Sequence, residues 1–208
     1  MNSHLRSTAG RRTLGLRGLL GVGILLLAAP TLPLLAAEKK TTAGSNDETA
    51  SRAAFLEAYK VLMNPRCMNC HPAGNQPLQG DDSHIHTQNV QRGHDGKGLY
   101  GMKCANCHQE KNVPGEHMPP GNPKWHLPTE EMPLVFQGKS PAELATQLKD
   151  PKLNGGKTLD QILKHVTSDE LVLAGWDPGD GRTKPPLSHD EFAAKMKEWI
   201  EKGAAIPE

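Results

Sequence analysis

The chain has 208 residues, with 24 Lys and Arg against 23 Asp and Glu, and only four Cys. This balance allows one or two ordinary domains and excludes a disordered polyelectrolyte. The sequence has no basic stripe with interleaved aromatic residues, which argues against nucleic acid as a partner. Because only 36% of the residues are hydrophobic and 4% aromatic, a folded domain needs support besides side-chain burial, such as disulfides, a metal or a large apolar cofactor.

Residues 1–37 have the pattern of an export signal. Met1–Arg17 carries four Arg and no acidic residue, and Gly18–Ala37 is uncharged and rich in Leu. Two prolines within the apolar run and the small residues at its end favour a cleaved signal peptide. A retained anchor stays open as an alternative, because twenty uncharged residues can just span a bilayer. In both cases the mature protein is expected in the periplasm, attached to the membrane only if the segment is retained.

Residues 38–50 are polar and show no hydrophobic period, which predicts a flexible tether. Residues 51–208 are then expected to form the folded domain. At its start Phe55, Tyr59 and Leu62 recur at helical spacing, which predicts a helix of about three turns that stops just before the first cysteine pair.

Two long segments, 72–101 and 113–137, are rich in Gly and Pro or amide residues and show neither a helical nor a strand period, so both are expected to be irregular. The C-terminal third instead contains three capping boxes, each ahead of apolar residues at helical spacing: Ser140 with Glu143, Thr158 with Gln161, and Ser188 with Glu191. Gly203 is expected to end the last helix. The predicted class is mainly α with long ordered loops.

All four cysteines fall in two five-residue motifs, Cys67-Met68-Asn69-Cys70-His71 and Cys104-Ala105-Asn106-Cys107-His108. Each is a C-x-x-C-H sequence, which is typical of covalent c-type haem attachment. Two cysteines spaced by two residues can bond the two vinyl groups of one haem as thioethers, and the following histidine can ligand the iron. The sequence therefore predicts two covalently bound haem c groups, which would supply the missing apolar core.

Zinc, disulfides and a thioredoxin-like redox pair are the competing interpretations of these cysteines. Paired zinc ligands usually lie about 15–20 residues apart, whereas 33 residues separate Cys70 from Cys104. Neither zinc nor a disulfide requires a histidine after each pair, and a redox pair of the thioredoxin type expects a βαβ context that the sequence lacks. Haem attachment is favoured over all three.

On these motifs the chain resembles the c-type cytochromes, and in particular small exported dihaem cytochromes c, over about Ser51–Lys202. The resemblance implies cytochrome c-like helices with long ordered loops wrapped around two covalently attached haems. It also implies that the helix before the first motif is crossed by the C-terminal helix, with Phe55 and Tyr59 facing Phe192, Met196 and Trp199.

The wording around the motifs, in the segments NPRCMNCHPAGNQPLQGDDSH, GEHMPPGNPKWHLP and LAGWDPG, resembles chains described as cytochrome-type subunits of isoquinoline 1-oxidoreductase. This resemblance implies a molybdenum hydroxylase as a redox partner, although nothing in this sequence is similar to a molybdopterin site.

The residue in the sixth position of each iron decides between electron transfer and chemistry on a bound molecule. His84 and His86 are the first choice, and only one of such an H-x-H pair can reach a given iron. His117 and Met118 are near-equal candidates in a rigid stretch after the second motif. His126 is third, because its neighbour Trp125 is expected to pack on a porphyrin ring. His165 is expected on the exposed face of its helix.

Two functions follow as hypotheses. The first is a periplasmic dihaem cytochrome c that carries single electrons between a dehydrogenase or hydroxylase and a membrane respiratory complex. The alternative is a small haem enzyme with one open iron site, which reduces peroxide or oxidises a small molecule. A third hypothesis is a haem-bearing structural or assembly subunit.

Overall fold

The computed structural model describes residues 37–208, and the predicted export signal lies outside them, apart from Ala37. Helices dominate the described part, as predicted, and strands contribute one two-residue pair. No helix in the described range is both long and apolar enough to cross a membrane. The elements are α1 Ala37–Leu62, α2 Pro65–Met68, β1 Leu78–Gln79, β2 His84–Ile85, the 3-10 turn η1 Cys104–Asn106, α3 Pro141–Lys149, α4 Leu159–Ser168, α5 Glu170–Leu173, the 3-10 turn η2 Ala174–Trp176, and α6 His189–Glu201.

Helix α1 is longer than the sequence predicts, because it runs through residues 38–50, where a flexible tether was expected. Once a helix exists, each added residue avoids the cost of nucleation, and this segment has no proline to stop the helix. Gly44 and Ser45 are exposed on this part of α1. The polar segment 38–50 is therefore part of a helix and not an irregular tether.

The three predicted capping boxes are all present, and they begin α3, α4 and α6. In each, the hydroxyl of Ser140, Thr158 or Ser188 accepts a hydrogen bond from the backbone N–H three residues on. The Glu or Gln side chain at that position in turn accepts a hydrogen bond from the backbone N–H of the capping residue. Gly203 takes a positive φ of 96° just beyond Lys202, the C-cap of α6, as expected for a residue that ends a helix.

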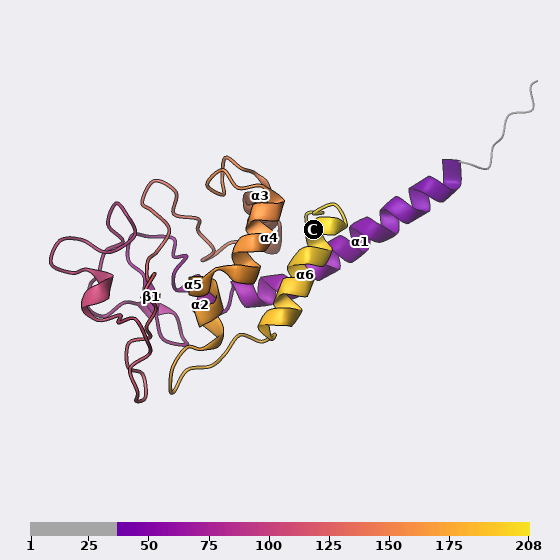
Figure 1. The fold of residues 1–208 in the computed structure, drawn as a ribbon. Coiled ribbons are helices and arrows are strands. Elements are labelled where there is room, and N and C mark those ends of the chain that lie inside the picture. Colours follow the sequence, from indigo (N-terminus) through magenta and orange to yellow (C-terminus); the bar gives the residue numbers. More distant parts are fainter. Residues whose placement is uncertain (1–36) are drawn as a thin grey trace, which may run out of the picture. The chain divides into compact units, whose positions relative to one another are not determined.

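The apolar core lies where α1 packs against α6, with α3 and α4 beside them (Figure 1). Phe55 of α1 and Trp199 of α6 are fully buried, and their ring centroids are 4.7 Å apart. Ser51 links the same two helices, because its hydroxyl donates to the Trp199 carbonyl at 2.8 Å and accepts from the Ala205 N–H at 3.0 Å. The predicted crossing of the first and last helices is thus present, with Tyr59 at the edge of the core.

Between Ile85 and Pro141 the described chain contains only the 3-10 turn η1, which agrees with the expected long loops. These loops lie together on the side of the molecule away from the α1–α6 pair (Figure 1). A buried cation fastens them, because the Arg92 side chain is 1% exposed and donates to the carbonyls of Pro128 at 2.7 Å and Gly74 at 3.0 Å. Hydrogen bonds from one arginine thus tie together segments that have little apolar surface to bury.

Candidate functional site

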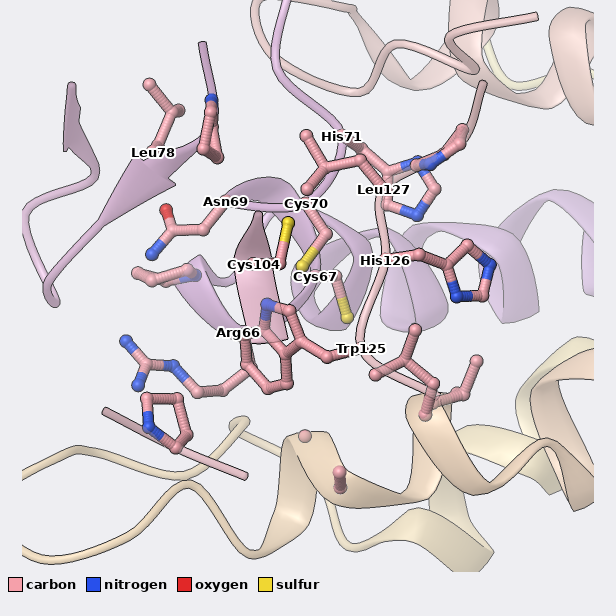
Figure 2. A pocket seen from close by; sticks show the side chains of 18 of the residues that line it. Arg66, Cys67, Asn69, Cys70, His71, Leu78, Cys104, Trp125, His126 and Leu127 are labelled. Carbon is pink, nitrogen blue, oxygen red and sulfur yellow. The ribbon is translucent and has the colours of Figure 1, made fainter. Parts of the chain in front are cut away.

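Both C-x-x-C-H motifs open into one cavity of about 830 Å³, which lies between the helices and the long loops. All four cysteines and both motif histidines line this cavity. Figure 2 shows Cys67, Cys70 and Cys104 gathered in the same space. The structure therefore brings together two motifs that are 37 residues apart in the sequence.

The first motif is placed by α2. The side chain of Asn64 caps this short helix by accepting from the Arg66 N–H, and Pro65 occupies its first turn. Cys67 lies on α2 and Cys70 follows one turn later, so both sulfurs reach the cavity. Burial raises the pKa of the Cys67 thiol to about 12 and that of Cys70 to about 11, with a smaller contribution from a neighbouring cysteine in each case. Both are free, protonated thiols at neutral pH.

His71 is held on two sides. Its Nδ1 lies 2.7 Å from the Leu134 carbonyl oxygen, and its ring stacks on Phe136 with centroids 3.9 Å apart and planes at 9°. A carbonyl can only accept, so Nδ1 carries the proton and Nε2 has a free electron pair. Burial lowers the pKa of His71 to about 4, which keeps the ring neutral at pH 7. A neutral imidazole fixed by its Nδ1–H is the usual form of a metal-binding histidine.

The second motif repeats this arrangement with different partners. His108 has its Nδ1 2.7 Å from the Pro120 carbonyl oxygen, and its ring stacks on Trp125 with centroids 4.1 Å apart and planes at 8°. Burial lowers the pKa of His108 as well. Trp125 was expected to pack on a porphyrin, and in this structure it packs on the motif histidine. Both histidines are therefore neutral, oriented and free at Nε2.

The predicted distal residues differ in whether they line the cavity and in what their ring nitrogens contact. His84, His86, His117 and His126 line the cavity, and Met118 is not among its lining residues and is 41% exposed. The Nδ1 of His84 lies 2.7 Å from an Asp82 carboxylate oxygen, and the His126 Nδ1 bonds the Lys124 carbonyl.

His86 is placed differently from the other candidates. Its ring lies edge-on to that of His108, with centroids 6.4 Å apart and an angle of 65° between the planes. Its Nδ1 is buried and has no hydrogen-bond partner among the described residues.

Sequence reasoning missed His165, which was expected to be exposed. It is half-buried on α4 and lines the cavity, and its Nδ1 lies 3.3 Å from a carboxylate oxygen of Asp169. It is also close enough to His71 that its charge contributes, after burial, to the low pKa of that histidine. The signals that would have found it are the His–Asp pair at i and i+4 and its position between Ile162 and Val166 on the apolar face of α4.

Positive charge also lines the cavity. The Arg66 side chain is 7% exposed, and its guanidinium lies 2.7 Å from Asp81 and 3.1 Å from the Gly80 carbonyl. Its Nε is buried without a hydrogen-bond partner in the described part of the chain. Arg182 lines the same wall, and its pKa is lowered mainly by burial and further by Arg66. Two neighbouring guanidiniums favour a negatively charged group in the cavity.

Across residues 37–208, no three or more His, Cys, Asp or Glu side chains come together as a group that could hold a metal ion. Compared with known proteins, the chain matches no family model, no curated protein and no solved structure.

Proposed function

We propose that this protein is a periplasmic dihaem c-type cytochrome that carries single electrons between redox partners. One observation carries the proposal: both C-x-x-C-H motifs line a common cavity, and in each the histidine is stacked on an aromatic ring with its Nδ1 2.7 Å from a backbone carbonyl oxygen. The two imidazoles are held in the same way, each by one carbonyl and one aromatic ring, although these groups come from different parts of the chain. This similarity favours a shared role over chance packing.

The residues fit two haem groups. Cys67 and Cys70 would bond one haem, and Cys104 and Cys107 the other, because all four are free thiols at the cavity. His71 and His108 would ligand the two irons through Nε2. When bound, each haem supplies a centre that gains or loses one electron.

The chain itself contributes orientation and electrostatics. Hydrogen bonds from Nδ1–H make the two imidazoles stronger electron donors and fix their direction. Arg66, with its buried Nε, would pair with a haem propionate, as would Arg182. Cys70 and Cys104 line the same cavity and are gathered in the same space (Figure 2). Two haems attached there would lie near enough to exchange electrons.

The partners follow from charge and from the sequence resemblance. Residues 38–208 carry 20 Lys and Arg against 23 Asp and Glu, and the propionates of two haems add further negative charge. Such a surface suits weak, salt-sensitive docking to a redox partner. We propose a dehydrogenase or hydroxylase as donor, with a molybdenum hydroxylase as one form of it, and a membrane respiratory complex as acceptor.

The test is haem content. The full chain is expressed with its export signal in cells that contain a c-type maturation system, and the purified protein is examined by pyridine haemochrome spectrum and intact mass. Two thioether-bound haems per chain are expected. The Cys67→Ala/Cys70→Ala double variant should retain one haem and lose one haem mass. A wild-type chain without covalent haem would contradict the proposal.

The alternative function, a small haem enzyme, is tested on the same sample. It requires a high-spin haem whose spectrum changes when cyanide or peroxide is added, whereas two low-spin haems that ignore both reagents support the electron carrier.

A further inference from the structure

His86 and His108 both line the cavity, and their rings are neighbours in an edge-on orientation. Their ring centroids are 6.4 Å apart. Metal–imidazole bonds are about 2.0–2.1 Å long, so two imidazole nitrogens on opposite sides of one metal lie about 4 Å apart, and the ring centres, each roughly 1.1 Å further back, lie about 6.3 Å apart. The observed separation therefore leaves room for one metal ion between the two rings.

Distance alone does not single out this interpretation, because aromatic rings in direct edge-to-face contact have centroids about 4.5–7 Å apart. The hydrogen bonding of His86 adds a second observation. Its Nδ1 is buried and has no partner among the described residues, although a buried polar atom is normally satisfied. His86 lines the cavity, and a rotation of its side chain that turns this nitrogen toward a metal there would satisfy it.

The backbone around His86 is fixed before any ligand arrives. The β1–β2 ladder pairs Leu78 with Ile85, and the His86 N–H donates to the Pro77 carbonyl at 3.0 Å. His86 therefore projects from an anchored hairpin rather than from a free loop, which lowers the cost of holding its ring in one place.

The competing histidines are engaged elsewhere. His84 pairs with Asp82 at 2.7 Å, and its side chain is 44% exposed. The His117 ring lies against Gly181, since a Cβ at that glycine would lie 3.0 Å from the ring. In the described part of the chain, neither ring packs near that of His108, as the His86 ring does.

We infer that His86 is the sixth ligand of the iron whose proximal ligand is His108, so that the second haem is bound by two histidines. The assignment rests on the proposed function, because it needs a haem at Cys104 and Cys107. Two histidine ligands make an iron low-spin, lower its potential relative to His/Met ligation, and leave it no open position for a small molecule. An enzymatic role would then be confined to the first haem.

The test compares the purified, haem-loaded wild type with His86→Ala and with the matched control His84→Ala. Haem content is measured first, and then the ferric proteins are examined by electron paramagnetic resonance and near-infrared magnetic circular dichroism. In His86→Ala, one of the two haems should lose its bis-histidine low-spin signal and become high-spin, and added imidazole should restore the signal. His84→Ala should keep the wild-type spectra.

A second variant covers the case in which His86→Ala does not accumulate. His86→Met should give the near-infrared charge-transfer band of methionine-bound ferric haem and a higher potential for one haem. The assignment is overturned if either variant contains two covalent haems with unchanged ligation spectra. A wild type without covalent haem would overturn the proposed function itself, so the two failures give different results.

Discussion

Gly121 lies next to the carbonyl that orients His108, and its substitution tests whether that carbonyl matters. A Cβ built on Gly121 would lie 2.1 Å from the carbonyl carbon and oxygen of Lys111 and 2.7 Å from its Cα. The segment is also pinned there, because the Gly121 N–H donates to the Asn112 side chain at 2.8 Å. In Gly121→Ala the two backbones have to separate by more than about 1 Å, since interiors are close-packed.

The separation should break the hydrogen bond between His108 and Pro120. That bond is 2.7 Å long, and a shift of this size takes it beyond hydrogen-bonding range. Overpacking costs about 1–3 kcal/mol and a lost hydrogen bond about 0.5–1.5 kcal/mol, so we expect the free energy of unfolding to fall by about 1.5–4.5 kcal/mol.

The same substitution should alter one haem. Without a partner for Nδ1–H, the imidazole is a weaker donor and favours ferric iron less, so the potential of that haem should rise. If the hydrogen bond favours the ferric state by about 0.5–1 kcal/mol, the rise is about 20–40 mV for one electron.

Denaturant unfolding and a spectroelectrochemical titration measure the two effects of Gly121→Ala. Gly74→Ala is the matched control, because a Cβ there meets nothing within 4 Å and its φ is not positive. If Gly121→Ala leaves both quantities at their wild-type values, or if Gly74→Ala changes them equally, the carbonyl does not orient His108 as argued.

Three further predictions concern stability. Ser51→Ala leaves the buried Ala205 N–H without its hydroxyl partner, whereas the Trp199 carbonyl still accepts from the Ala204 N–H, so chemical denaturation should show a loss of about 1–3 kcal/mol; a loss below about 0.5 kcal/mol would contradict this. Burial alone would raise the pKa of Asp81, but hydrogen bonds from Thr183 and the charge of the Arg66 guanidinium together lower it by more, so the pKa lies below its usual value. The stabilising contribution is therefore complete above the unfolded pKa of about 3.9 and is lost as the pH falls through the lower folded pKa, so the stability difference between wild type and Asp81→Asn should shrink as the pH falls below about 5; a constant difference would refute the coupling. Hydrogen exchange on the chain prepared without haem should show fast exchange in residues 72–137 and retained protection in α1 and α6, and equal protection throughout would show that the loops fold alone.

Local patterns in the sequence predicted the local features of the structure. Ser140, Pro141 and Glu143 stand within four positions, so the start of α3 could be read without tertiary information. The two C-x-x-C-H motifs are equally local, and they identified the four cysteines and two histidines that line the cavity together. The long loops followed from the density of Gly and Pro, because those residues stop both helices and strands.

Long-range contacts could not be predicted from spacing. The carbonyl that bonds His71 belongs to Leu134, 63 residues away, and the one that bonds His108 belongs to Pro120, 12 residues away. Any residue has a carbonyl, so no side chain marks these positions in the sequence. His165 was misjudged although its pairing with Asp169 and its place beside Ile162 were visible in the sequence, because neither signal shows that loops without a hydrophobic period cover that face of α4.

The hydrogen bonds that orient the two histidines also fasten the loops. The segment with Leu134 and Phe136 is held to the first motif by the ring of His71, and also by its backbone, because the Phe136 N–H donates to the His71 carbonyl at 2.9 Å. The loop half has little apolar surface of its own, so these contacts and the Arg92 bonds carry much of its order. Loosening a loop should therefore disturb a haem ligand, and removing a haem should loosen the loop, because one set of contacts serves both. Stability and redox potential are consequently expected to change together in variants of the loops and to vary independently in variants of the α1–α6 core.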